Sequence, residues 1–258
     1  MKTDDETMRR IYLAIAILIA LTACVSGAPP RTNPSIQTVI SSLGERITSF
    51  HSLIEVHQDG SLTATETISV VADGTKIKRG IFRTLPTERQ CRNGTRFHVP
   101  IKVLKTKRDG QDEPYHIKSL PGEMKIYLGK ADVFLEPGQY TYTLSYKIED
   151  GVSLSGEFQM LYWNVTGSCS DFNIGKATAE IHLPRSISVL EASAYTGTKQ
   201  EKDDSFKYTI SSDGIILFET TRVLMPNEGL TIMIIWPKGL IEAPNPCELN
   251  KVEKGGRP

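Results

Sequence analysis

The feature of this sequence that most constrains its fold is a regular alternation of apolar and polar residues. Residues 140–148 (YTYTLSYKI) place aromatic and aliphatic side chains at every second position, with Thr, Ser and Lys between them. A period of two puts one set on each face of a β-strand, so the segment is predicted to be a half-buried strand. Residues 62–70 and 177–183 alternate in the same way. Residues 230–236 (LTIMIIW) are apolar on both faces, which is typical of an inner strand.

Turn signals separate these strands and no long helical pattern stands between them. The signals are Asp-Gly and Pro-Gly pairs, which begin at Asp59, Asp73, Asp109, Pro121, Pro137, Asp150 and Asp213. Short strands at such intervals favour an all-β fold over an α/β fold. We therefore predict an antiparallel β-sandwich, Ig-like or jelly-roll-like, over residues 45–240.

The N-terminus has the pattern of an export signal. A basic start at residues 8–10 (MRR) precedes an almost wholly apolar stretch at 11–21, and either Met1 or Met8 begins the chain. The stretch suits a signal peptide and is shorter than the roughly 20 residues of a membrane span. Residues 21–24 (LTAC) resemble the lipobox of bacterial lipoproteins, in which the cysteine thiol is acylated and becomes the new N-terminus.

This pattern predicts a signal peptide at 1–23, a lipidated Cys24 carrying diacylglycerol and palmitate-type chains, and a Pro-rich tether that ends at residue 44. The alternative is an uncleaved signal anchor. Both place the remaining chain outside the cytoplasm, so we expect a membrane-anchored lipoprotein of the bacterial cell envelope. Residues 241–258 form a polar C-terminal tail.

Charge and motif content narrow the function classes. Lys and Arg number 30 and Asp and Glu number 30, and this balance argues against a nucleic-acid partner. No Cys-x-x-Cys occurs and the five His are scattered, so we predict no metal site and no cofactor. No Gly-x-Ser-x-Gly and no Gly-rich phosphate loop occurs either. We therefore predict no catalytic residues.

Glu66 falls on the apolar face of its predicted strand, with Ala64 and Ile68 on either side. A buried carboxylate needs a partner, because an unpaired buried charge costs several kcal/mol. Arg83 and Arg79 are the candidates, and we predict a structural ion pair between Glu66 and Arg83. A ligand-binding carboxylate in a cleft is the alternative interpretation.

The segment 162–164 (YWN) places two aromatic side chains on opposite faces of a strand. One is expected in the core, and the other is free to stack on a sugar ring or a peptide. Asn164 is expected to shape the turn into Gly167 by bonding nearby backbone. Tyr162, Trp163 and Asn164 are therefore candidate ligand-contact residues.

Several motifs in order resemble one known family. They are residues 59–66 (DGSLTATE), 79–83 (RGIFR), 161–167 (LYWNVTG), 183–184 (LP), 195–197 (YTG) and a closing segment from Glu228 to Gly239. This order is similar to the extracytoplasmic N-terminal domain of the YciQ-like predicted membrane proteins, a family of unknown function. Members continue into transmembrane helices after the closing strand. The resemblance thus implies an exported domain that is held by lipid in place of helices, or a piece of a longer chain.

With Cys24 acylated, three cysteines remain: Cys91, Cys169 and Cys247. One disulfide and one free thiol are expected in an oxidising compartment, and the sequence allows three pairings. Cys91 with Cys169 is our choice, because each lies in a loop just beyond a family-like motif.

Two function classes follow. The first is a noncatalytic module that binds an envelope protein, a peptide or a glycan. The alternative is a hydrolase of envelope polymers that uses carboxylates such as Glu66 or Glu157 in a cleft, which needs two carboxylates roughly 5–10 Å apart.

Overall fold

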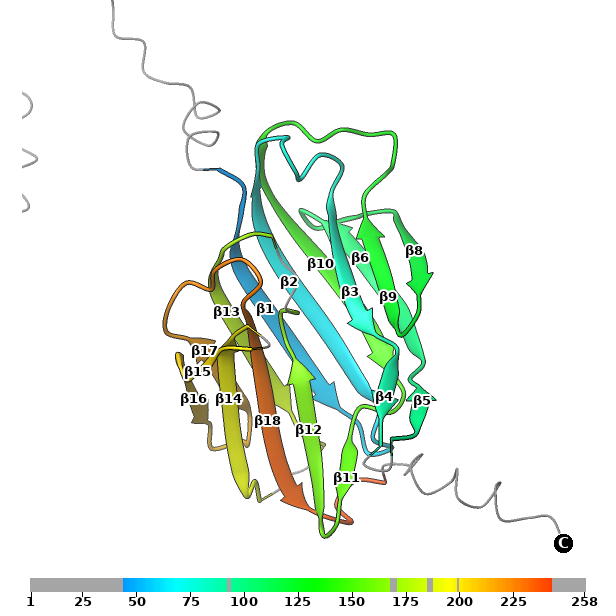
Figure 1. Ribbon diagram of the computed structural model, residues 1–258, viewed down its shortest axis with the longest axis vertical. Coiled ribbons are helices and arrows are strands. Elements are labelled where there is room, and N and C mark those ends of the chain that lie inside the picture. Colours follow the sequence, from blue (N-terminus) through cyan, green and yellow to red (C-terminus); the bar gives the residue numbers. More distant parts are fainter. Residues whose placement is uncertain (1–43, 92–93, 168–170, 185–187, 199, 243–258) are drawn as a thin grey trace, which may run out of the picture. The chain divides into compact units, whose positions relative to one another are not determined.

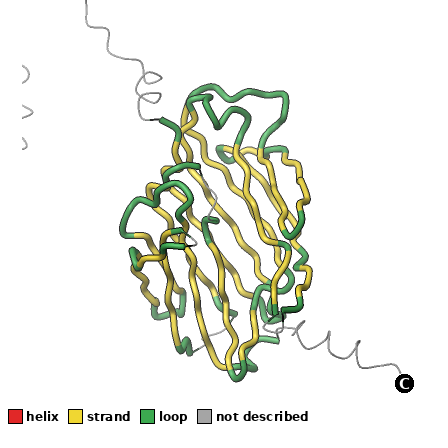
Figure 2. The backbone as a smooth tube through the Cα atoms, in the orientation of Figure 1, coloured by secondary structure: helices red, strands yellow, loops and turns green. Residues whose placement is uncertain are grey.

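The computed structural model describes residues 44–242, apart from 92–93, 168–170, 185–187 and 199. Its regular elements are all β-strands, in sheets of eight, five, three and two strands (Figure 1, Figure 2). The predictions for residues 1–23, for Cys24 and its tether to residue 43, and for residues 243–258 lie outside the described residues.

The largest sheet contains eight strands. Their order is β16 (Phe206–Ile210), β17 (Ile216–Thr220), β13 (Ile174–His182), β1 (Arg46–Val56), β2 (Leu62–Ala72), β10 (Gly138–Ile148), β6 (Ile101–Arg108) and β7 (Gln111–Asp112). The segment 140–148 forms most of β10, and the strand prediction there is confirmed. In β2 every second residue from Leu62 to Val70 is buried.

Two smaller sheets lie in front of the large one in Figure 1. The five-stranded sheet has the order β11 (Ser153–Ser155), β12 (Phe158–Asn164), β18 (Gly229–Pro237), β14 (Glu191–Gly197) and β15 (Lys202–Asp203). The three-stranded sheet has the order β3 (Ile81–Pro86), β9 (Glu123–Leu128) and β8 (Tyr115–Leu120), and a two-stranded sheet joins β4 (Glu88–Gln90) to β5 (Arg96–His98). The apolar segment 230–236 is in β18, an inner strand as predicted.

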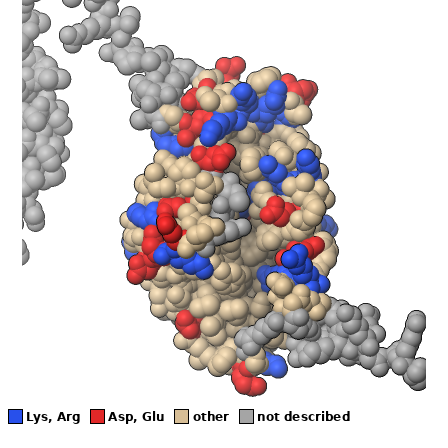
Figure 3. Space-filling view, in the orientation of Figure 1, with Lys and Arg blue, Asp and Glu red and all other residues tan. Residues whose placement is uncertain are grey.

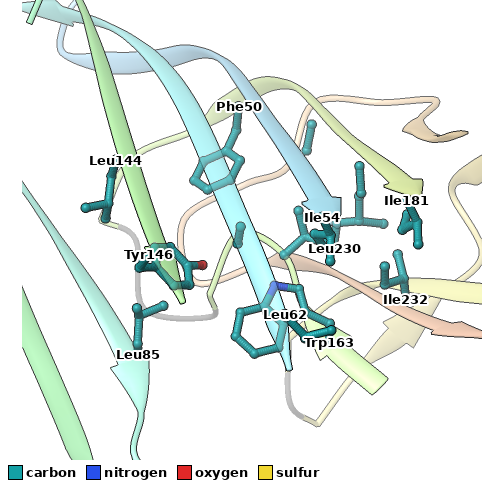
Figure 4. Packing of buried hydrophobic residues seen from close by; sticks show 14 of the residues in the cluster. Phe50, Ile54, Leu62, Leu85, Leu144, Tyr146, Trp163, Ile181, Leu230 and Ile232 are labelled. Atoms are coloured by element: carbon teal, nitrogen blue, oxygen red, sulfur yellow. The ribbon is translucent and has the colours of Figure 1, made fainter. Parts of the chain in front are cut away.

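The core lies between the large sheet and the two sheets in front of it. Figure 4 shows Leu230 and Ile232 of β18 beside Ile54 of β1, and Leu85 of β3 beside Tyr146 of β10. One continuous cluster of buried apolar side chains therefore joins all three sheets.

The predicted all-β class with stacked sheets is confirmed. One pair differs from a wholly antiparallel arrangement: β1 and β13 run parallel, with Phe50 opposite Ala177. Parallel neighbours need a long crossover connection, which here is the whole chain between Val56 and Ile174. The alternation of residues sets which face is buried and carries no information about strand direction.

Candidate functional site

An apolar cavity of about 550 Å³ opens where the three sheets approach one another. Phe50 of β1 and Ile68 and Val70 of β2 line it from the large sheet. The opposite lining comes from the run 80–86, which includes all of β3, from Asn164 at the end of β12, and from Thr166 and Gly167 after it. The volume falls in the range of sites that hold small molecules or short peptide segments.

The RGIFR segment builds one wall through the alternation of β3. Arg83 and Leu85 are buried, whereas Phe82 is 49% exposed on the other face. β3 pairs with β9 alone and forms one edge of its sheet. In an antiparallel edge strand, alternate residues direct their backbone N–H and C=O away from the sheet. No backbone hydrogen bond of the described residues involves this free edge of β3.

A buried ion pair fastens β3 to the large sheet beside the cavity. Glu66 is 0% exposed and Arg83 is 6% exposed. Arg83 Nε donates to Glu66 Oε2 at 2.7 Å and Nη2 donates to Oε1 at 3.0 Å. Tyr146 Oη donates to the same Oε1 at 2.6 Å. The structure thus brings the two residues of the predicted ion pair together and adds Tyr146, which the alternation had assigned only to the core.

The guanidinium of Arg83 also holds the turn that follows β12. Its Nη1 donates to the carbonyl of Thr166 at 3.0 Å and its Nη2 to the carbonyl of Val165 at 2.5 Å. A Cβ at Gly167 would lie 2.7 Å from Nη1, so only glycine leaves room for Arg83 there. Asn164 Oδ1 accepts from the Gly167 N–H at 2.9 Å, the turn contact expected of it. One side chain therefore links the three sheets.

The electrostatics of this network raise the pKa values of Arg83 and Tyr146. Burial, the largest single influence, would lower the pKa of Arg83, but the contributions of Glu66 and Tyr146 together outweigh it and the pKa is raised. Burial, and then the Glu66 charge, raise the pKa of Tyr146 well above its usual value. Both Glu66 oxygens accept hydrogen bonds from Arg83 or Tyr146, and the carboxylate is fully buried, so its contacts are made within the fold.

The candidate ligand-contact residues separate in space. Trp163 packs in the core, whereas Tyr162 is 44% exposed and shares a hydroxyl–hydroxyl hydrogen bond with Tyr195 of β14. Asn164 lines the cavity, and Tyr162 and Trp163 are not among its lining residues. The aromatic residue that sequence reasoning missed is Phe50, whose ring centre lies 5.2 Å from the Arg83 guanidinium carbon.

The remaining predicted groups are spread apart or not described. Glu157 is exposed in the turn between β11 and β12, remote in the fold from the buried Glu66. Among the described residues no three His, Cys, Asp or Glu side chains are arranged to hold a metal ion. Cys91 is disulfide-bonded, whereas Cys24, Cys169 and Cys247 lie outside the described residues.

The described residues contain no helix with the length and apolar character that crossing a membrane requires.

Comparisons with known proteins support the family resemblance. The chain is 29% identical over 207 residues to the uncharacterized protein YciQ of Escherichia coli strain K12. The matched region covers 79% of this chain and 32% of YciQ. The chain thus spans about a third of that relative's length. Among solved structures, yeast LTA4 hydrolase matches with a TM-score of 0.44 and 11% identity, over 79% of this chain and 31% of that one.

An M1 zinc metallopeptidase from Deinococcus radiodurans matches with a TM-score of 0.43 and 16% identity, over 75% of this chain and 42% of that one. At such low TM-scores, neither likeness bears on the activity of this chain.

The family model described as "Predicted membrane protein (DUF2207) N-terminal domain" matches residues 46–236, nearly the whole β-rich part. The chain therefore belongs to this family of predicted membrane proteins of unknown function, and its β-sheets form the family's N-terminal domain.

Proposed function

We propose that the protein is a noncatalytic binding module of the cell envelope, held at the membrane through an acylated Cys24, and that it captures an extended peptide segment of an envelope protein. The lipobox at residues 21–24 and membership of a membrane protein family support the location. The observation that carries the peptide proposal is the free edge of β3, which lines an apolar cavity along its whole length.

An extended peptide suits this site better than a glycan. A peptide strand beside β3 would pair with backbone groups that β9 leaves free, and alternate side chains would enter the cavity. The lining from the large sheet is apolar at Ile47, Phe50, Ile68 and Val70, where a sugar would leave its hydroxyl groups without partners. The favoured ligand is thus a segment with apolar residues at every second position.

The hydrolase alternative receives no support from the buried carboxylate. Glu66 is bound by Arg83 and Tyr146, and Glu157 is not among the cavity residues. The carboxylates that line the cavity are Glu123 and Asp171. The proposal therefore assigns binding, and no chemical step, to this site.

The test is a peptide selection on the full chain in detergent. Peptides with alternating apolar residues would be selected and then remade with single N-methyl groups along the backbone. If the peptide pairs with β3, methylation at alternate positions lowers affinity at least about tenfold, because those N–H groups donate to β3, and methylation between them has little effect. Equal effects at all positions would contradict strand pairing.

A second arm tests the cavity itself. Val70→Phe fills space beside β2 and should abolish binding, whereas Leu104→Phe, at an exposed residue of β6, should not. Thermal melting of both variants verifies that they fold. Hydrolysis of envelope glycan or peptide by the purified protein would overturn the noncatalytic assignment.

A further inference from the structure

A second cavity, of about 330 Å³, lies at one end of the three-stranded sheet and is strongly basic. Lys76, Lys78, Arg79, Lys130 and His116 line it, and no carboxylate does. The aromatic side chains of Phe82 and Tyr127 also line the cavity, and His116 stacks on Tyr127 with ring centres 4.6 Å apart. Figure 3 shows one group of Lys and Arg over the upper part of the molecule, with acidic groups directly beside it.

These cations make no close ion pair in the described part of the chain. No ion pair within 4.0 Å among the described residues involves Lys76, Lys78, Arg79 or Lys130. The nearest acidic residues along the chain are Asp73, Asp132 and Glu136, which stand outside the cavity lining. Four cations around one hollow whose lining contains no carboxylate favour an anionic ligand, and phosphate oxygens are acceptors that Lys and Arg bind well.

The cavity is built by two loops that the fold locks together. Loop 73–80 joins β2 to β3, and loop 129–137 joins β9 to β10. The Leu135 N–H donates to the Lys78 carbonyl at 2.8 Å. A Cβ at Gly80 would lie 1.8 Å from the Leu128 carbonyl oxygen, and one at Gly129 would lie 2.0 Å from that of Arg79. The two glycines thus allow the backbones to meet beneath the cations.

Apolar side chains stand exposed beside the basic cavity. Phe134 is 63% exposed and Val133 is 44% exposed on loop 129–137, and the guanidinium carbon of Arg79 lies 4.1 Å from the centre of the Phe134 ring. Cations next to exposed aromatic and aliphatic groups are the arrangement of proteins that rest on a membrane, where the charges meet headgroups and the apolar groups enter the acyl boundary.

The chain also enters the fold at this end. Glu45, one residue before β1, accepts hydrogen bonds from the backbone N–H groups of Thr75, Lys76 and Ile77 in the basic loop. The pairing of Arg46 with Val71 and of Gly138 with Ala72 puts the start of β1 at the same end of the sheet as both loops. A membrane attachment upstream of Glu45 would therefore be nearer along the chain to this end of the sheet than to the opposite end.

We infer that the two loops form a docking site for an anionic phospholipid surface, with a headgroup phosphate in the basic cavity and Phe134 at the acyl boundary. The inference needs membrane attachment at the N-terminal side and is independent of the peptide proposal. It orients the domain with loops 73–80 and 129–137 against the membrane, while the edge of β3 stays open at its side.

The experiment uses the full chain with Phe134→Trp, reconstituted into lipid nanodiscs with brominated acyl chains. One set of discs contains phosphatidylglycerol and phosphatidylcholine, and the other contains phosphatidylcholine only. Unchanged protein gives the background from Trp163 and Trp236, both of which are buried. We expect quenching of the new tryptophan at least about twofold above background in phosphatidylglycerol discs, because brominated chains quench only residues at the acyl boundary.

Charge variants then test the cavity. In the Phe134→Trp chain, the added pair Lys78→Gln and Arg79→Gln should remove the quenching above background. The control pair Lys102→Gln and Lys105→Gln, at exposed positions of β6, should leave that quenching unchanged. Quenching that is equal in phosphatidylcholine discs, or that survives the Lys78 and Arg79 changes, would overturn the headgroup assignment. Background quenching in both discs would overturn docking altogether, and peptide binding would be unaffected by that result.

Discussion

Tyr146 on β10 donates its hydroxyl hydrogen to Oε1 of Glu66 on β2, and the same oxygen accepts a hydrogen bond from Arg83 Nη2. Glu66 therefore receives three hydrogen bonds from two other elements of the fold. Because Arg83 also binds the two carbonyls after β12, the position of the cavity wall depends on this carboxylate.

Arg83→Met should destabilise the protein by about 3–5 kcal/mol, because it leaves a buried carboxylate without its cation. Arg83→Met combined with Glu66→Leu should recover most of that loss, since no buried charge then remains. Chemical denaturation measures both. The control is Arg96→Met, in an exposed pair 3.7 Å from Glu88, where a loss below about 1 kcal/mol is expected. Equal losses for Arg83→Met and Arg96→Met would contradict the network's role.

The stability of the protein should fall at alkaline pH through Tyr142. Burial raises the pKa of Tyr142 to about 12, although the Arg108 charge opposes this. Between about pH 10 and pH 12 the folded state retains a proton that the unfolded state releases, so stability falls as pH rises, by up to about 1.4 kcal/mol per pH unit.

Tyr142→Phe should flatten this slope and cost less than about 1 kcal/mol at neutral pH, because the hydroxyl has no hydrogen-bond partner among the described residues. Urea unfolding of both proteins across the alkaline range gives the comparison. The raised pKa of Tyr146 also lowers the free energy of unfolding as pH rises, and this contribution remains in the Tyr142→Phe variant. Identical slopes for the two proteins would refute the assignment to Tyr142.

Gly80→Ala should destabilise the fold by more than about 3 kcal/mol, since the backbone of Leu128 must move to admit the methyl group. The matched control is Gly74→Ala. Gly74 also has a positive φ, +85° against +122° at Gly80, but nothing lies within 4 Å of its would-be Cβ. We expect only the conformational cost of about 1–2 kcal/mol there. Similar melting points for the two variants would show that the close approach at Gly80 is relaxed easily.

Cys24 should carry the acyl chains. Cells fed a clickable palmitate analogue should label the unchanged protein, and Cys24→Ala should remove the label. Cys247→Ala, a cysteine in the polar tail, serves as the control and should keep it. Label on the Cys24→Ala protein would contradict the lipobox interpretation.

Cys91 should pair with Cys169 in the exported protein. Proteolysis without reduction, followed by mass spectrometry, should recover the two cysteines in one linked peptide. Cys91 is disulfide-bonded in the structure, so the measurement decides between its partners. A linked peptide of Cys91 with Cys247 would contradict the pairing.

Most strand positions can be predicted from the sequence, because a strand that is buried on one face has apolar residues at every second position. The alternation in residues 62–70 also places Glu66 inside, and a buried carboxylate needs a cation, so local pattern and electrostatics predict an arginine partner. The structure shows that this partner is Arg83 and not the other candidate, Arg79. The role of Tyr146 as a hydrogen-bond donor to Glu66 was not predicted, because an aromatic residue on the inner face of a strand is expected to be a core residue. Its hydroxyl meets Glu66 only because β10 lies beside β2.

The strand positions and the buried ion pair thus follow from local sequence, since each depends on residues a few positions apart or on the cost of burying a charge. The export signal and the acylated Cys24 stay predictions. The parallel pairing of β1 with β13, the cavity along β3 and the basic hollow between loops 73–80 and 129–137 were decided only in three dimensions. Each joins segments tens of residues apart in the chain, and such contacts depend on sheet order, which a pattern of faces does not encode.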